Sequence, residues 1–178
     1  PELEDAANLK ARKVIGIMSE DMNPTHWEIM AKEIAKELND DEVSGVVVTH
    51  GTDTMHYSAS AMSFFLQNLN KPVIFTGAQR SIDRGSSDAF SNLLCSVQAA
   101  AKFDGATVAI CMHATSDDGF CILIRGTKVR KMHATRRDAF RPINELPLAK
   151  ISENGKIEII NKNYHKRNEG KTKVDDSF

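Results

Sequence analysis

Residues 46–58 read VVVTHGTDTMHYS, and this stretch decides how the chain is expected to fold. Three valines in a row are typical of a strand that is buried on both faces. A polar turn around Gly51 follows, and the next apolar residues recur at the spacing of one helix face, at Met55, Ala59, Met62, Leu66 and Leu69. A buried strand that leads through a glycine turn into a helix is the building unit of a parallel α/β sheet.

The same alternation of strand and helix extends over most of the chain. We expect strands at residues 13–18, 45–49, 73–76, 107–112 and 120–124. Helical spacing begins near Trp27, Met55 and Phe90. Isoleucines on both sides of Asn154-Gly155 predict a small hairpin near the end. The sequence therefore predicts an α/β fold with a mostly parallel sheet, helices on both faces and a closing β-hairpin.

Length and composition indicate a single globular body of ordinary size. The chain has 178 residues, of which 41% are hydrophobic and 26% are charged, and these values are average for a folded domain. Polar residues dominate both ends of the sequence. We therefore divide the chain into a polar lead-in at 1–12, an α/β body at 13–160 and a polar linker at 161–178.

Charge and cysteine content argue against several classes of protein. The formal net charge is −1, so the chain lacks the overall field that draws a protein to nucleic acid or to a membrane. No apolar run approaches the roughly 18 residues of a membrane-spanning helix. The cysteines lie in apolar segments without paired spacing, which favours reduced core thiols and a cytoplasmic protein; they are Cys95, Cys111 and Cys121.

Polar residues follow the predicted strands at the edge where open α/β sheets bind their ligands. Three such loops occur, at residues 19–21, 50–54 and 77–80. In the second loop Thr52 or Asp53 could cap the following helix, and one capping side chain would explain the turn. The loop carries more polar side chains than one helix cap requires. Its hydroxyl groups and backbone amides could hold a small anion or a carboxylate. The sequence therefore leans toward a binding site here.

Other candidate groups have an ordinary structural explanation beside the chemical one. Lys131 lies in a basic stretch that is a solvated face by default, because a lysine acts as a base only when burial or nearby cations lower its pKa. The set Cys111, His113 and Cys121 fits no familiar zinc spacing, so a core role is expected. Asp117-Asp118 could pair two carboxylates, but a turn before Gly119 explains them equally well. We expect the remaining histidines at the surface or at helix edges: His26, His56 and His165.

Four stretches of this sequence resemble blocks of the L-asparaginase family. They are THGTDTM at 49–55, KPVIFTGAQ at 71–79, MSEDMNPTHW at 18–27 and VRKMHATRRDAF at 129–140. The resemblance implies the three-layer large lobe of that family. It also implies amide hydrolysis with threonine nucleophiles, without a metal and without a cofactor held by this chain.

The resemblance assigns the catalytic roles to Thr52, Asp53 and Lys131. Lys131 would take a proton from the Thr52 hydroxyl or from an attacking water. Asp53 would orient the lysine and also bind the α-ammonium group of the substrate.

The resemblance assigns the substrate contacts to three loops. Ser19 would hold the α-carboxylate, with Glu20 near the α-ammonium group. Ala78 would offer its backbone to the side-chain amide of the substrate. The backbone amides around Gly51 and Thr52 would stabilise the oxyanion.

Two longer stretches resemble one branch of the family, the D subunits of archaeal glutamyl-tRNA(Gln) amidotransferases. They are residues 77–93 and 114–144. This branch implies hydrolysis of glutamine (or asparagine) to release ammonia. The partner in such an enzyme, its E subunit, would use that ammonia, with ATP and magnesium, to convert Glu-tRNA(Gln) to Gln-tRNA(Gln). The branch also implies a homodimer within a heterotetramer, with tRNA reached through the complex rather than by this chain.

The sequence departs from the family pattern at both ends. The family's first threonine, in a TGGTI-like turn, and its tyrosine flap lie upstream of Pro1, and its small C-terminal lobe lies beyond Phe178. We therefore expect the 178-residue polypeptide alone to be inactive or nearly so. Two other functions stay open from sequence: a stand-alone L-asparaginase, and a non-catalytic small-anion binder.

Overall fold

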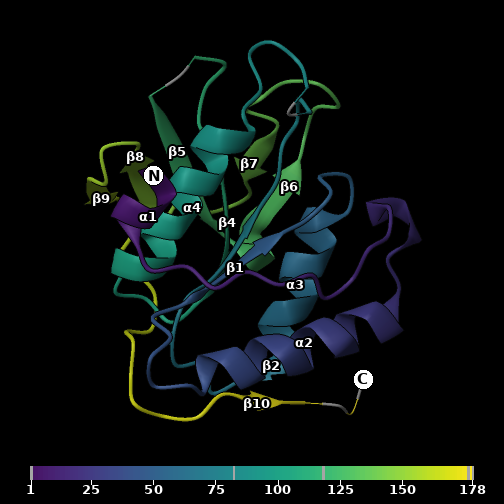
Figure 1. Ribbon diagram of the computed structural model, residues 1–178, viewed down its shortest axis with the longest axis vertical. Helices are drawn as coiled ribbons and strands as arrows, with labels where there is room; N and C mark the ends of the chain where they lie inside the picture. Colours follow the sequence, from purple (N-terminus) through teal and green to yellow (C-terminus); the bar gives the residue numbers. More distant parts are fainter. Residues whose placement is uncertain (1, 82, 118, 176, 178) are drawn as a thin grey trace.

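The computed structural model describes residues 2–81, 83–117, 119–175 and 177 of the chain. A six-stranded central sheet has the order β1-β3-β4-β5-β8-β9. Its strands are β1 Val46–Thr49, β3 Val73–Thr76, β4 Val108–His113, β5 Phe120–Arg125, β8 Ala149–Ser152 and β9 Ile157–Ile159. The α-helices are α1 Glu2–Ala6, α2 Pro24–Leu38, α3 Met55–Phe65 and α4 Ala89–Lys102 (Figure 1). Among the described residues, none of the helices is both long and apolar enough to cross a membrane.

The direction of each strand pair follows from the connection between the two strands. Helix α3 joins β1 to β3, helix α4 joins β3 to β4, and both pairs are parallel. A short loop joins β4 to β5, and this pair and the two after it are antiparallel. A helical crossover returns the chain in the same direction, whereas a short loop, as between β4 and β5 and between β8 and β9, reverses it. The longer segment between β5 and β8 contains β6 and β7. The α/β class is confirmed, and so is the closing hairpin, formed by β8 and β9.

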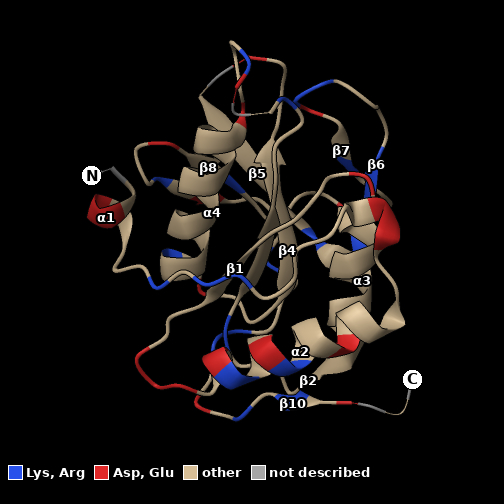
Figure 2. Cartoon of the chain, turned by 45° about the vertical axis from the view of Figure 1, so that its right-hand side comes forward, with Lys and Arg blue, Asp and Glu red and all other residues tan. Residues whose placement is uncertain are grey.

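Alternate residues of the strands build two cores, one on each face of the sheet. Val73 and Phe75 of β3 pack with α2 and α3, whereas Ile74 between them packs with α4. Figure 1 shows α2 and α3 on one side of the sheet and α4 on the other. Helix α2 begins at Pro24 after the cap residue Asn23, and its outer surface carries both acidic and basic residues (Figure 2). The three-layer arrangement is therefore confirmed.

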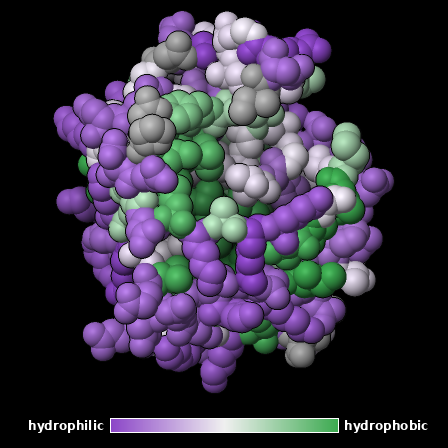
Figure 3. Space-filling view, in the orientation of Figure 1, coloured by the Kyte–Doolittle hydropathy of each residue, from purple (hydrophilic) through white to green (hydrophobic). Residues whose placement is uncertain are grey.

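The strand expected at residues 13–18 is not formed, and that prediction was wrong. The segment makes no ladder hydrogen bonds with any described strand, and the side chains of Val14 and Ile17 are 45% and 41% exposed. An apolar run specifies a strand only when a partner strand satisfies its backbone groups. Strand β1 forms the edge of the sheet in the described residues and is half-buried. Figure 3 shows apolar surface gathered between α4 and α3, over β1.

Residues after 160, predicted as a linker, run along the opposite end of the molecule from the polar strand-end loops (Figure 1). Strand β10 Lys173–Val174 pairs with β2 Leu66–Gln67. The buried side chain of Asn70 donates to the carbonyl of Gly170 at 2.8 Å and accepts from the Thr172 hydroxyl at 2.8 Å. These contacts fix the segment on the body of the domain. The boundaries at 12 and 160 stay a prediction.

Candidate active site

Two polar turns meet at the carboxyl ends of β1 and β3. The strands are parallel neighbours, with Thr49 opposite Thr76, so the residues that follow them leave the sheet side by side. A β-carbon at Gly77 would lie 2.4 Å from the carbonyl oxygen of His50 and 3.3 Å from the methyl group of Thr52. Only a glycine therefore lets the second turn approach the first so closely.

A third turn, the short 3₁₀ helix Ser19–Asp21, closes over the first one. The Thr54 hydroxyl donates to the carbonyl of Ser19 at 2.7 Å. A β-carbon at Gly51 would lie 2.7 Å from the β-carbon of Ser19 and 2.8 Å from its hydroxyl oxygen. Ser19 is 6% exposed, and its hydroxyl donates to Glu20 at 3.2 Å. The loop at 19–21 thus packs directly against the glycine turn at 50–54.

Lys131 reaches this point from strand β6 Val129–Lys131, which pairs with β7 Phe140–Pro142. Its Nζ donates to the Thr52 hydroxyl oxygen at 2.9 Å and to Asp53 Oδ1 at 2.7 Å. The lysine side chain is 10% exposed, whereas the Asp53 side chain is 58% exposed. The expected proximity of Thr52, Asp53 and Lys131 is therefore observed.

The geometry suits a direct proton transfer between a hydroxyl and an amine. At 2.9 Å the Thr52 oxygen and Lys131 Nζ need no bridging water. A threonine hydroxyl is a weak nucleophile, and an adjacent base is one way to activate it. To serve as that base, Nζ must first give up one of its own protons. The exposed side of Asp53 is open to a cationic group of a ligand.

The comparison with known families bears on this site. A family model described as "Asparaginase, N-terminal" matches residues 1–165. The chain belongs to this asparaginase family.

Two relatives with more than half of their aligned residues identical to this chain carry the same name. The D subunit of the glutamyl-tRNA(Gln) amidotransferase from Thermococcus kodakarensis is 53% identical over 178 residues, and the D subunit from Pyrococcus abyssi is 54% identical over the same length. Both alignments cover 100% of this chain and 40% of the relative. The chain therefore spans about two fifths of the length of these relatives.

Solved structures of asparaginases share the fold. The L-asparaginase of Thermococcus kodakarensis superposes with a TM-score of 0.82 at 26% identity, over 94% of this chain and 47% of that one. L-asparaginase I of Vibrio cholerae gives 0.74 at 36% identity, over 89% and 45%. This chain therefore has the fold of these asparaginases over about half of their length.

The predicted substrate residues lie on the two turns that pack against the turn at 50–54. Ser19 and Glu20 lie on the 3₁₀ turn against Gly51, and Ala78 lies between Gly77 and Gln79 in the turn after β3. Ser19 is buried and Glu20 is exposed. The structure brings these residues to one edge of the sheet. Their contacts with a substrate stay predictions.

His56 is a residue whose position the sequence did not reveal. It was expected at the surface or at a helix edge; it lies in the first turn of α3 and is only 9% exposed, so the surface alternative is wrong. Its ring centroid lies 4.1 Å from that of Tyr57, with the rings tilted by 39°, and the ring meets Phe140 edge-on at 6.5 Å. Burial lowers the pKa of His56, and the charges of Arg130 and Lys131 lower it further. The cationic form of the His56 imidazole is therefore disfavoured near the lysine of the site.

The other candidate groups belong to the core or to turns. Three of these groups are buried: Cys111, His113 and Cys121. The Nδ1 atom of the His113 ring lies 2.6 Å from the side-chain oxygen Oδ1 of Asn92. In the described part of the chain, no set of three or more His, Cys, Asp or Glu is arranged to hold a metal. Asp117 is exposed and hydrogen-bonds through its backbone to Thr115. Asp118 lies outside the described residues.

Proposed function

We propose that the complete protein containing this chain is the glutaminase subunit of a tRNA-dependent amidotransferase. It hydrolyses glutamine (or asparagine) and releases ammonia. The observation that carries this proposal is the contact of Lys131 Nζ with both Thr52 and Asp53, at 2.9 and 2.7 Å. Identity above 50% to named D subunits over the whole chain supports it.

The proposed mechanism assigns one task to each side chain of the set. Lys131 accepts a proton from the Thr52 hydroxyl or from a water that attacks the amide carbon. Asp53 holds the amine in place and binds the α-ammonium group of the substrate on its exposed side. Ser19 holds the α-carboxylate, Glu20 lies near the α-ammonium group, and the backbone amides around Gly51 stabilise the developing oxyanion.

The name shared by the relatives supplies the proposed partner. The E subunit of such an amidotransferase receives the ammonia and, with ATP and magnesium, converts Glu-tRNA(Gln) to Gln-tRNA(Gln). We propose a homodimer of the present protein within a heterotetramer, and tRNA binding through the complex. A cytoplasmic location is proposed too, and the free buried thiols Cys95, Cys111 and Cys121 support a reducing compartment.

The test is ammonia release by the complete protein with its partner. Thr52→Val removes the hydroxyl but keeps the side-chain shape, so we expect turnover to fall by roughly two to four orders of magnitude while substrate still binds. Thr135→Val changes an exposed threonine in the loop after Lys131 and is the matched control. A Thr52→Val protein that turns over glutamine at the wild-type rate would remove the basis of the proposal.

A stand-alone L-asparaginase is the second candidate, because the solved structures with this fold are asparaginases. The two functions differ in what happens to the ammonia. A glutaminase of the amidotransferase passes it to Glu-tRNA(Gln) in a reaction that needs the partner and ATP. An asparaginase releases it to solvent, with no change on adding a partner. Measuring amidated tRNA beside free ammonia decides between them.

A further inference from the structure

A fully buried carboxylate lies just outside the proposed site. Asp88, the residue before helix α4, is 0% exposed. Its Oδ2 accepts from the backbone N–H of Gln79 at 3.1 Å, and its Oδ1 accepts from the backbone N–H of Arg80 at 2.9 Å. A buried carboxylate is costly unless hydrogen bonds satisfy it, so these contacts are firmly specified.

Asn92, one turn further along α4, completes the same arrangement. It is also 0% exposed, and its amide nitrogen donates to Asp88 Oδ2 at 2.9 Å and to the carbonyl oxygen of Gly77 at 2.9 Å. Its own carbonyl oxygen accepts from the backbone N–H of His113 in β4 at 3.1 Å. Asp88 and Asn92 therefore hold the turn after β3 at its start, Gly77, and at its end, Gln79 and Arg80.

These contacts determine how the peptide groups of Ala78 are oriented. A peptide group is planar, with its C=O and N–H pointing in opposite directions. The N–H of Gln79, held by Asp88, and the C=O of Ala78 belong to one peptide group. The C=O of Gly77, held by Asn92, and the N–H of Ala78 belong to the preceding one. The buried side chains of Asp88 and Asn92 thus fix the directions in which the C=O and the N–H of Ala78 point. Neither side chain is part of the proposed site.

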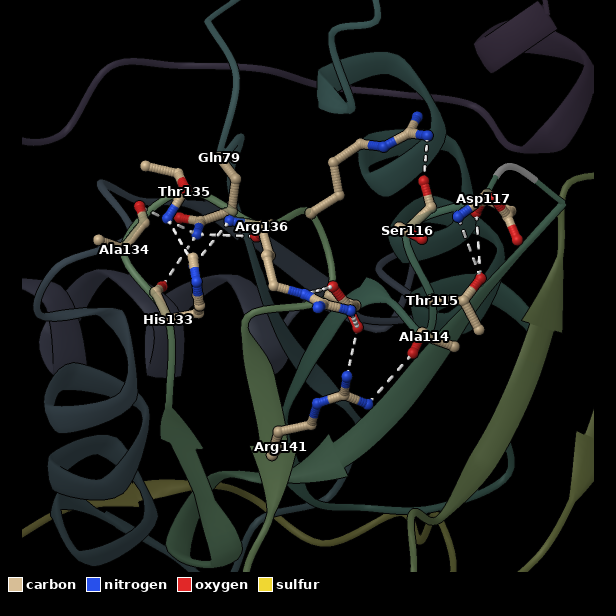
Figure 4. A network of polar contacts seen from close by, with 12 residues as sticks. Gln79, Ala114, Thr115, Ser116, Asp117, His133, Ala134, Thr135, Arg136 and Arg141 are labelled. Atoms are coloured by element: carbon tan, nitrogen blue, oxygen red, sulfur yellow. Dashed lines mark hydrogen bonds and ion pairs between the residues drawn. The ribbon is translucent and has the colours of Figure 1, made fainter.

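The side chain of Gln79 connects this turn to the loop that follows Lys131. Its amide nitrogen donates to the carbonyl oxygen of Arg136 at 3.0 Å and points toward those of His133 and Ala134 (Figure 4). That loop is itself anchored, because buried Asp138 accepts two hydrogen bonds from Arg136, at 2.8 and 2.9 Å. The turn that carries Ala78 and the loop after the lysine are therefore held to each other.

We propose that Asp88 and Asn92 are positioning residues that aim the Ala78 carbonyl at the leaving amide group of the substrate, and so select amides. This inference rests on the proposed function. The Ala78 carbonyl can accept a hydrogen bond only from a substrate group that carries an N–H or an O–H. A primary amide offers that donor, whereas an ester of the same acid does not.

The experiment compares an amide with an ester in the complete protein bound to its partner. The substrates are glutamine and the γ-methyl ester of glutamate, and kcat and KM are measured for both. Asp88→Asn replaces one acceptor oxygen by an amide group, which can no longer accept from both backbone N–H groups. We expect kcat/KM for glutamine to fall roughly tenfold to a hundredfold, while kcat/KM for the ester changes less than about threefold.

Asp83→Asn is the matched control, because it removes an exposed carboxylate from the same loop. It should leave both substrates at wild-type rates. If Asp88→Asn does not fold, Asn92→Ala is measured with the same two substrates. An equal loss for amide and ester, no loss at all, or the failure of both variants to fold would overturn the positioning role. A wild-type complex that does not hydrolyse glutamine would instead refute the proposed function.

Discussion

Replacing Lys131 by methionine should greatly reduce catalysis while leaving the free energy of unfolding almost unchanged. Methionine keeps the unbranched apolar stem and removes the amine that contacts Thr52 at 2.9 Å. A general base contributes roughly 10² to 10⁴ in rate, so kcat should fall by that factor, equivalent to about 2.7–5.5 kcal/mol of transition-state stabilisation. Asp53 is 58% exposed and stays hydrated without its partner, so the free energy of unfolding should change by less than about 1 kcal/mol.

The assay is single-turnover ammonia release beside thermal unfolding, both in the complete protein with its partner. Lys131→Arg keeps a positive charge on a group that does not deprotonate, so it should be as inactive as the methionine variant. Arg130→Met alters the exposed neighbour on the same strand and should behave as wild type. Activity in Lys131→Arg close to wild type would show that charge alone suffices and would refute the base role.

Three further changes test the surroundings of the site. Gly77→Ala places a β-carbon 2.4 Å from the His50 carbonyl, so thermal unfolding should show a loss of about 1–3 kcal/mol, with reduced ammonia release. Asn70→Ala breaks the buried bonds to the segment around Thr172 and should cost about 2–4 kcal/mol in a denaturant titration; no loss would mean that the segment is not anchored there. The pKa of His56 lies below its ordinary 6.5, so the unfolded chain binds more protons near that pH and the free energy of unfolding should fall as pH drops through it. Denaturation between about pH 8 and about pH 5 should show this slope, and His56→Leu should reduce it.

The sequence revealed those parts of the fold in which local pattern and long-range pairing agree. Sequence predicted the strand Val46–Thr49, the turn after it and the following helix. Both the apolar run and the helical periodicity can be recognised from neighbouring residues alone. The segment at 13–18 is also rich in apolar residues and forms no strand. Its residues carry no information on whether a partner strand lies beside them, and pairing decides that question.

The candidate site, too, was only partly predictable from the sequence. The turn around Gly51 indicated a binding site from its composition alone. Lys131 lies 79 residues from Thr52, and spacing over such a distance predicts nothing about contact. Only the likeness to a known family connected the two residues. His56 was missed because Phe140, which packs against its ring, comes from strand β7 far along the chain.

The uneven exposure of Lys131 and Asp53 indicates from which side a substrate reaches the site. Lys131 is nearly enclosed, while the outer side of Asp53 faces solvent. Before substrate binds, the carboxylate has one cation close to it, at 2.7 Å. On the proposed function, an arriving α-ammonium group would bind the same carboxylate, which would hold the reacting amide of the substrate close to Thr52. On the proposed function, the one carboxylate therefore both fixes the amine beside Thr52 and orients the substrate toward that hydroxyl. A substrate analogue without the α-amino group should then lose more in kcat than its weaker binding accounts for.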